Sequence, residues 1–200
     1  MNVNYKPGIS REAQRTVSSI RVCLIALLVA FLFTTAGRTV HASGMNDNEY
    51  AIKAAALYKF ISFVDWSPQA LPESSPTVTV GVLGKDPFGS ALDVINGKTA
   101  RGKRVVVKRL SSLQDLENVQ ILFVSASEAG HWKQITDAAR GAGILTVSET
   151  KGFARSGGVI NFTTENNRLG MEINTDAAEH SRLKISSQLL GLKVTHIIRG

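Results

Sequence analysis

Apolar residues between positions 77 and 148 fall into four short runs, and the stretches between them carry turn or helix patterns. The runs are TVTVGVL (77–83), RVVVKRL (104–110), ILFVS (121–125) and ILTV (144–147). Helical turns are expected at 87–95 and 113–116, and a helix at 129–140, ended by Gly141 and Gly143. This alternation predicts a mostly parallel sheet covered by helices on both faces, with 121–125 as a central strand because it is the most hydrophobic run.

A long helix is predicted ahead of these strands. Asn46 and Glu49 have the spacing of a capping box, and the helix should end at Trp66-Ser67-Pro68. Its apolar stripe consists of Tyr50, Ala54, Leu57, Tyr58, Ile61 and Val64. Phe60 and Phe63 lie off that stripe, so the helix is either sandwiched between other elements or presents a spare aromatic face to a partner.

The pattern changes near the C-terminus. Residues 158–163 and 168–174 read as strands joined by a turn at 165–167, which predicts an antiparallel hairpin. Two helices should follow, at 176–182 with Thr175 as N-cap and at 187–192 with Ser186 as N-cap. The expected fold is therefore an α/β sandwich in one domain, with a mostly parallel central sheet, an antiparallel C-terminal hairpin and helices on both faces.

Residues 1–42 have the pattern of a cleaved secretory signal. Arg11, Arg15 and Arg21 precede twelve largely apolar residues at 22–33, and Val40-His41-Ala42 has small residues where signal peptidase reads before a cut. Twelve residues span about 18 Å as a helix, against about 30 Å of bilayer hydrocarbon, so stable membrane insertion is not expected. We expect export to a bacterial periplasm and a single domain at 43–200.

The leader dominates the charge and the cysteine count. The chain has a formal net charge of +7, but five of its 23 basic residues and one of its 16 acidic residues precede Ser43, which leaves +3 afterwards. So small an excess gives no argument for nucleic-acid binding. The one cysteine, Cys23, also lies in the leader, so the exported domain should hold neither a disulfide nor a thiolate metal site.

Motifs of catalysis are missing from the sequence. The Gly81–Gly84 turn lacks both phosphate-binding fingerprints, no serine lies in a G-x-S-x-G elbow, and no histidines have metal-ligand spacing. We expect a protein that is not an enzyme and holds neither a metal nor a cofactor.

Two groups of residues are candidate binding sites. On the strand at 104–110, Arg104 and Lys108 should share one face, while Arg109 shares the apolar side. They form either a solvated rim or a docking patch for an acidic partner or anionic lipid. The second group mixes glycines and polar residues with apolar strands: Phe153, Gly157, Gly158, Asn161, Glu172, Asn174, Lys184, Ser186 and Ser187.

Glu172 decides between two interpretations of this polar cluster. It lies between apolar neighbours, so if buried it needs a partner, for which Arg182, Lys184 and Asn161 are candidates. The cluster is either a polar clamp that ties the hairpin to the C-terminal helices, or a site for a ligand or partner.

Several segments in order resemble the YfiR family. They are EYAIKAAALYKFISFVDW (49–66), VGVLGKDPFG (80–89), ILFVSAS (121–127), and the block 145–190 with LTVSETKGFARSGGVINF, EIN and KISSQLL. The resemblance implies a small periplasmic α/β protein, homodimeric in some members, that binds the periplasmic domain of an inner-membrane GGDEF protein. It implies that this diguanylate cyclase is held inactive, which lowers cyclic di-GMP and biofilm formation. Some members have paired cysteines, which this domain lacks.

Two functional hypotheses follow. The first is a regulatory brake that contacts its partner through Phe60, Phe63 and Trp66 or through Arg104, Lys108 and Arg109. The second is a periplasmic small-ligand-binding module with its pocket around Asn161, Glu172 and Lys184.

Overall fold

The computed structural model describes residues 43–165 and 168–199, with side chains from residue 47 onward. The chain divides into two units, Met1–Ala42 and Ser43–Gly200. The predicted leader and its cleavage site lie outside the described residues, so everything below concerns the second unit.

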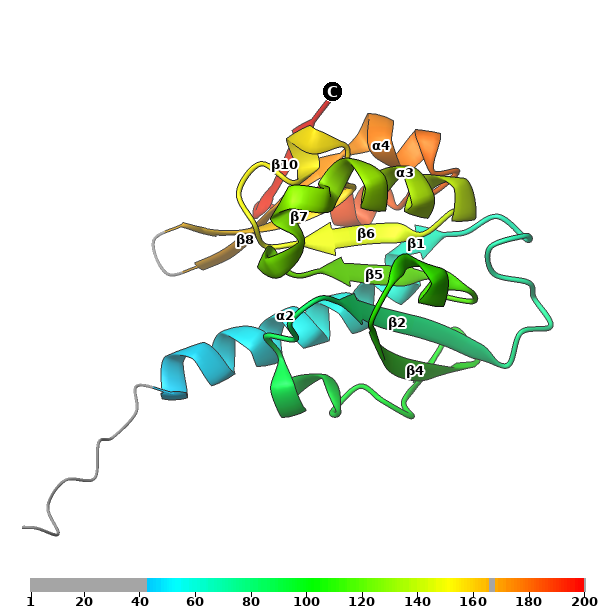
Figure 1. Cartoon of the computed structure of the whole chain (residues 1–200), viewed down its shortest axis with the longest axis horizontal. Coiled ribbons are helices and arrows are strands. Elements are labelled where there is room, and N and C mark those ends of the chain that lie inside the picture. Colours follow the sequence, from blue (N-terminus) through cyan, green and yellow to red (C-terminus); the bar gives the residue numbers. More distant parts are fainter. Residues whose placement is uncertain (1–42, 166–167, 200) are drawn as a thin grey trace, which may run out of the picture. The chain divides into compact units, whose positions relative to one another are not determined.

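A mixed sheet of eight strands forms the centre of this unit, in the order β10-β8-β7-β6-β5-β2-β4-β3 (Figure 1). β4, β2, β5, β6 and β7 run parallel, β7 and β8 form an antiparallel hairpin, and β10 runs parallel to β8. The strands span β2 Thr77–Leu83, β3 Thr99–Ala100, β4 Lys103–Leu110, β5 Ile121–Val124, β6 Leu145–Ser148, β7 Ile160–Glu165, β8 Arg168–Asn174 and β10 Thr195–Ile198. A separate two-stranded sheet pairs β1 Val64–Asp65 with β9 Lys184–Ile185.

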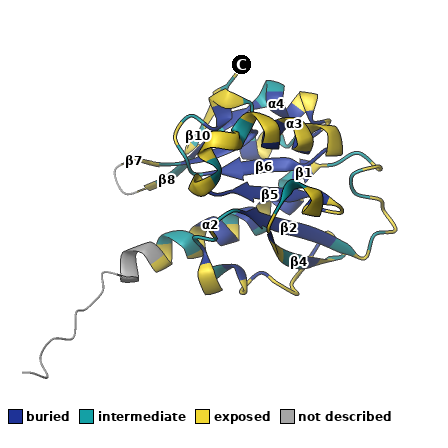
Figure 2. Ribbon diagram, in the orientation of Figure 1, coloured by how far each residue is buried: buried dark blue, intermediate teal, exposed yellow. Residues whose placement is uncertain are grey.

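Each face of the sheet has its own apolar core (Figure 2). α2 (Ser43–Phe63) packs on one face, where Leu57 and Phe60 join Ile121 and Phe123 of β5. α3 (Trp132–Ala142) packs on the other through Ile135, against the intervening β5 residues Leu122 and Val124. Because successive strand residues point to opposite faces, a strand covered on both sides must be apolar throughout, as β5 is.

Short helical elements complete the unit. The α-helices are α4 (Thr175–His180) and α5 (Ser187–Leu190), and the 3-10 turns are η1 (Gly89–Leu92), η2 (Leu113–Leu116), η3 (Ala126–His131) and η4 (Ala154–Ser156). The α/β class, the central place of β5 and the C-terminal hairpin confirm the prediction from sequence.

Several helix ends differ from the expectation. α2 begins at Ser43, ahead of Asn46, and ends at Phe63 because the chain continues as β1 in the small sheet. The N-cap of α4 is Asn174, whose side chain accepts a hydrogen bond from the Ala177 N–H, and Thr175 is already helical. Gly143 alone caps α3, in a left-handed conformation with φ of 68°. Each difference reflects a tertiary or capping contact that outweighs the local pattern.

Candidate functional site

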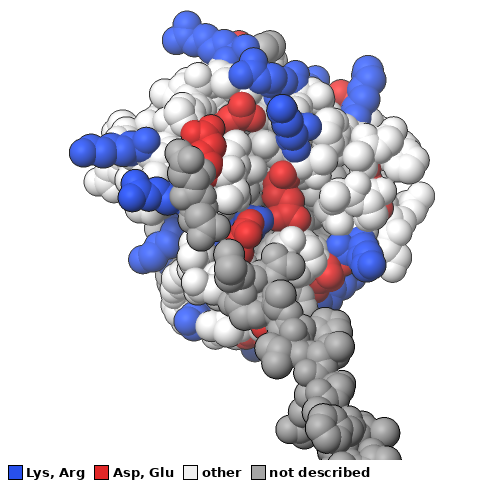
Figure 3. Space-filling view, turned by 90° about the vertical axis from the view of Figure 1, so that its left-hand side faces the viewer, with Lys and Arg blue, Asp and Glu red and all other residues white. Residues whose placement is uncertain are grey.

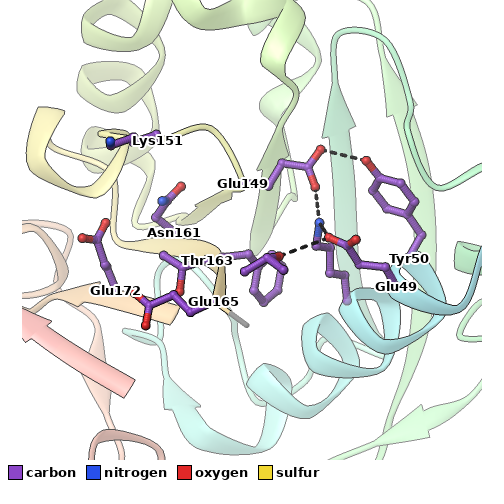
Figure 4. A pocket seen from close by; sticks show the side chains of 11 residues that line it. Glu49, Tyr50, Glu149, Lys151, Asn161, Thr163, Glu165 and Glu172 are labelled. Atoms are coloured by element: carbon purple, nitrogen blue, oxygen red, sulfur yellow. Dashed lines mark hydrogen bonds and ion pairs between the residues drawn. The ribbon is translucent and has the colours of Figure 1, made fainter. Parts of the chain in front are cut away.

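A cavity of about 600 Å³ opens between the first turns of α2 and the β7–β8 hairpin (Figure 4). One wall follows the carboxyl end of β6, which stops at Ser148 and continues as Glu149. That edge of a parallel sheet is where open α/β folds hold ligands. Its lining residues are Glu49, Tyr50, Lys53, Glu149, Lys151, Asn161, Phe162, Thr163, Thr164, Glu165 and Glu172.

A buried lysine links α2 to the end of β6. The Lys53 side chain is only 5% exposed, and its Nζ lies 2.6 Å from Glu49 Oε1 and 2.5 Å from Glu149 Oε2. Glu49 is one helical turn before Lys53, so α2 itself sets the first ion pair, while the fold brings Glu149 from far along the chain. Burying an ammonium group is costly unless it is paired, and two carboxylates meet that need here.

Tyr50 joins the same cluster. Its hydroxyl donates a hydrogen bond to Glu149 Oε1 at 3.0 Å. The pKa of Tyr50 is raised to about 12, mainly because the hydroxyl is partly buried. The negative charge of Glu149, the hydrogen bond to Glu149 and the charge of Glu49 raise it further, in that order. The phenol therefore stays protonated at neutral pH and acts as a donor.

The β7–β8 hairpin presents oxygen atoms at the other end of the cavity. Asn161 lies directly opposite Glu172 in the strand register, and Thr163 follows two residues later on the same face. Asn161 is 1% exposed, yet its Oδ1 accepts no hydrogen bond from any described residue. An unpaired buried carbonyl oxygen is costly, so Asn161 lowers the stability of the fold at this place.

Glu172 has a partner other than those expected from sequence. Arg155 places Nη2 3.7 Å from Glu172 Oε1, and its side chain is 70% exposed, so the ion pair is weak. Arg182 and Lys184 do not pair with it in the described structure: Lys184 lies on β9 opposite Asp65. Of the three candidate partners, only Asn161 is adjacent.

The predicted polar cluster separates into three places. Asn161 and Glu172 line the cavity. A second group, Lys184, Ser186 and Ser187, lies where α2 ends, and there the Ser186 N–H donates a hydrogen bond to Phe63 O. The Ser186 hydroxyl caps α5, as predicted. The remaining members, Phe153, Gly157, Gly158 and Asn174, surround η4.

The group around η4 is a clamp, which we define as Phe153, Gly157, Gly158 and Asn174. Asn174 Nδ2 donates to Ala154 O at 2.8 Å, and its Oδ1 accepts from the Ala177 N–H at 2.9 Å. A Cβ at Gly158 would overlap the buried Phe153 ring, and Gly157 has a φ of 94°, which favours glycine. The clamp interpretation therefore holds for these residues, but Lys184 lies outside both the clamp and the cavity.

The aromatic contact set needs one correction. Phe60 is 1% exposed and stacks on Phe162 with ring centroids 6.0 Å apart, so it lies in the core rather than on a spare face. The apolar face of the helix is broad because most of its circumference packs against the rest of the unit, while its outer side is exposed at Ala51, Ile52, Ala55, Lys59 and Ser62. Phe63 and Trp66 are half-buried, and Trp66 Nε1 donates to Gln120 O at 3.2 Å.

The three basic residues predicted as a docking patch on β4 also differ in their surroundings. Arg104 and Lys108 are exposed, as expected. Arg109 is held on the other side by Asp86 at 2.9 Å and Asp93 at 3.3 Å, so two carboxylates already occupy its guanidinium. Only Arg104 and Lys108 of this trio therefore offer charges without an ion-pair partner in the described part of the chain.

The cavity carries excess negative charge. It is lined by four glutamates, Glu49, Glu149, Glu165 and Glu172, against two lysines. On the face that Figure 3 shows, acidic side chains gather near the middle and basic ones lie mostly around the rim.

Among residues 43–165 and 168–199, no group of three or more histidine, cysteine or acidic side chains is arranged to hold a metal ion. Within the same residues, no helix has the length and apolarity needed to cross a bilayer.

Of the eleven residues that line the cavity, the sequence pattern assigns only Asn161 and Glu172 to a candidate binding site. It places Tyr50 in the apolar stripe of a helix and gives neither Lys53 nor Glu149 a role. A signal was present in the Glu49–Lys53 spacing of four and in the position of Glu149 directly after an apolar strand.

Comparison with known proteins identifies the family. The profile described as YfiR/HmsC-like matches residues 50–193, which is most of the chain and all the elements that form the cavity. The chain belongs to the YfiR/HmsC-like family. This is a family of regulators in cyclic di-GMP signalling and is not a catalytic one.

No curated protein sequence matches this YfiR-like chain. Among solved structures, a conserved domain protein from Vibrio cholerae is similar with a TM-score of 0.49 and 11% identity, over 74% of this chain and 60% of that protein. The chain thus spans less than two thirds of that protein's length. The yvaA protein of Bacillus subtilis is similar with a TM-score of 0.28 and 17% identity, over 40% of this chain and 30% of that one. Similarities this distant carry no functional argument.

Proposed function

We propose that this YfiR-like protein is exported to the periplasm by residues 1–42 and holds a membrane-bound diguanylate cyclase inactive through the cyclase's periplasmic sensor domain. Lower cyclic di-GMP and less biofilm would follow. The observation that carries the proposal is the family match across residues 50–193. The paired, structural roles of the buried polar groups Lys53 and Asn174 are compatible with a binding protein.

Repression would act by differential binding. A regulator shifts a switch only as far as it binds one state more tightly than the other, and a shift from 99:1 to 1:99 takes about 5.5 kcal/mol. An interface of about 1,600 Å² is large enough to supply that difference. The protein therefore needs a contact surface but no chemistry of its own.

Two surfaces are candidates for this contact: the exposed charges Arg104 and Lys108 of β4, and the half-buried aromatics Phe63 and Trp66 at the end of α2. Arg104 and Lys108 are solvent-exposed, and Phe63 and Trp66 are accessible in part. Phe60 is not part of the proposed contact because it is buried in the core. Arg109 is not part of it because its guanidinium already pairs with Asp86 and Asp93. An acidic patch on the sensor domain would complement Arg104 and Lys108.

Deletion and complementation test this proposal. Loss of the gene should raise cellular cyclic di-GMP, and the wild-type gene should restore it. The Arg104→Gln/Lys108→Gln variant should restore it less, and should bind the sensor domain about tenfold more weakly at low salt, because steering charges are lost. Lys133→Gln/Lys193→Gln removes the same charge elsewhere and should behave as wild type. Unchanged cyclic di-GMP in the deletion strain, with its cyclase present, would contradict the proposal.

A second candidate function is a small-ligand-binding module. The cavity beside the β7–β8 hairpin favours it, because a volume of about 600 Å³ suits a small molecule and the lining combines apolar, hydroxyl and charged side chains. Ligand-induced stabilisation of the purified protein tests it: a screen that raises the melting temperature with no metabolite class would argue against this function.

A further inference from the structure

The two edges of the eight-stranded sheet are built differently. At one edge, β3 is two residues long, and the part of β4 that β3 leaves free carries Lys108 and Arg109, while Asn96 Oδ1 accepts a hydrogen bond from the Val107 N–H. Short strands, charges and side-chain caps are devices that keep further strands away. At the other edge, β10 is four residues long and, within the described residues, pairs only with β8 (Figure 1). The sheet therefore has one blunted edge and one open edge.

The outer side of β10 presents backbone groups that β8 does not use. The Met171 N–H of β8 donates to Val194 O at 2.9 Å, so the parallel ladder continues through the backbone groups of His196 and Ile198. The N–H and C=O groups of Ile197 consequently point away from β8. A donor and an acceptor on one open edge are what a further strand needs in order to pair.

Exposed apolar side chains gather at the same edge. Of the five large apolar side chains that are exposed in the described structure, three are Leu192, Val194 and Ile197, at 45%, 42% and 52% exposure. In the strand register, Ile197 lies opposite Ile173, and Ile173 lies opposite Ile160, and these two are fully buried. The apolar row on the α2 side of the sheet thus ends uncovered at β10, where an added strand would extend it.

The charges around β10 select the kind of strand that fits. Residues 191–199 include Lys193 and Arg199 and no acidic residue. The two cations flank β10 and do not lie within it, so the middle of the strand is free to pair. Antiparallel pairing with a second copy of β10 would bring both sets of cations to one short ladder with no carboxylate to offset them. A segment that carries carboxylates would be attracted.

We propose that β10 is a docking edge for an extended, acidic segment of a partner protein, which adds one more strand to the sheet. Backbone hydrogen bonds to Ile197 supply the pairing, and apolar side chains of the segment cover Val194 and Ile197. Its carboxylates lie near Lys193 and Arg199. Because β10 and β4 lie near opposite ends of the strand order, this surface is separate from Arg104 and Lys108 and goes beyond the function proposed above.

The experiment uses three heptapeptides, blocked at both ends, as probes for the purified protein. EVTVEVT is acidic and favours extended structure, KVTVKVT differs from it only in charge, and EVTPEVT keeps the charge but lacks a central backbone donor. Calorimetric titration at low salt should show saturable binding of EVTVEVT, at least about tenfold weaker binding of KVTVKVT, and no binding of EVTPEVT.

Three results would overturn the proposal. If EVTVEVT does not bind, the edge accepts no acidic strand. If all three peptides bind equally, the binding depends on neither charge nor backbone pairing. If sedimentation shows a dimer that is lost in Ile197→Pro, the edge belongs to a second copy of this chain.

Variants locate the binding on β10. Ile197→Pro removes the outward N–H and leaves the ladder to β8, because proline is tolerated on an edge strand where its nitrogen faces solvent, and it should abolish EVTVEVT binding. Arg199→Glu should weaken EVTVEVT binding about fivefold and strengthen that of KVTVKVT, because one attraction becomes a repulsion. Circular dichroism checks that both variants fold.

Matched controls change the same kinds of residue elsewhere. Val94→Thr alters an apolar side chain that is 64% exposed, and Lys59→Glu reverses an exposed charge on α2, and both should leave the Kd for EVTVEVT unchanged. Acidic-peptide binding that survives both Ile197→Pro and Arg199→Glu would refute the assignment to β10.

Discussion

Asn161 and Asn174 belong to the same β7–β8 hairpin and are equally buried, at 1% and 2% exposure, but their surroundings differ. Both ends of the Asn174 amide are hydrogen-bonded, to Ala154 and Ala177, within the clamp. Asn161 borders the cavity, and its oxygen is unpaired in the described structure. One asparagine holds the fold together, whereas the other costs stability and needs another reason to be there.

The comparison extends to the regions around the two residues. The clamp is closely packed: Gly158 makes room for the Phe153 ring, and Asn174 both caps α4 and hydrogen-bonds to Ala154 in η4. The cavity is lined mostly by polar and charged side chains, and its carboxylates are only partly matched by cations. Local violations of good packing tend to mark functional sites, which is why the cavity and not the clamp is the ligand candidate.

The largest expected effect comes from replacing the two asparagines with leucine. Asn174→Leu leaves the Ala177 N–H buried without a partner and leaves Ala154 O with only the long hydrogen bond from the Gly157 N–H at 3.4 Å, so it should cost about 3 kcal/mol of unfolding free energy. Asn161→Leu removes an already unpaired group of similar size and should change the unfolding free energy by less than about 1 kcal/mol. Urea denaturation measures both. Equal losses in the two variants would show that Asn161 is a structural residue and would erase the contrast.

Replacing Lys53, the buried lysine of the cavity, should have a smaller but measurable effect on the free energy of unfolding. Lys53→Ala leaves Glu49 and Glu149 facing each other and should cost about 2 kcal/mol, less than a fully buried pair because Glu49 is 36% exposed. Lys133→Ala removes a surface pair with Asp137 at 2.7 Å from a side chain that is 91% exposed, and should cost less than about 0.5 kcal/mol. If both variants lose the same stability in urea, the Lys53 cluster is no more than a surface contact.

The two regions also differ in how far sequence predicts them. The β2 bounds follow from TVTVGVL alone, because burial on both faces requires an unbroken apolar run. β10 was missed because it is a half-exposed edge strand with a mixed pattern, recognisable only when β8 is beside it. Lys53 and Glu149 are 96 positions apart, so their ion pair depends on the folded sheet and no local pattern encodes it. The adjacency of Asn161 and Glu172 is predictable from sequence because the hairpin register is short-range.

The smallest expected effect is a pH dependence that belongs to the cavity alone. The pKa of Tyr50 is raised from 10.0 to about 12, so the folded protein holds this proton more tightly than the unfolded chain. Its contribution to stability is fully present below pH 10 and is lost as the pH rises toward 12, because the phenolate would form in a partly buried site beside Glu149. Tyr50→Phe removes the titrating group, so the variant should lose less stability than wild type between these pH values, and the two should respond alike below pH 10. Urea denaturation at pH 9, 10 and 11 measures the difference, and parallel curves across that range would mean that neither burial nor the charge of Glu149 raises the pKa of Tyr50.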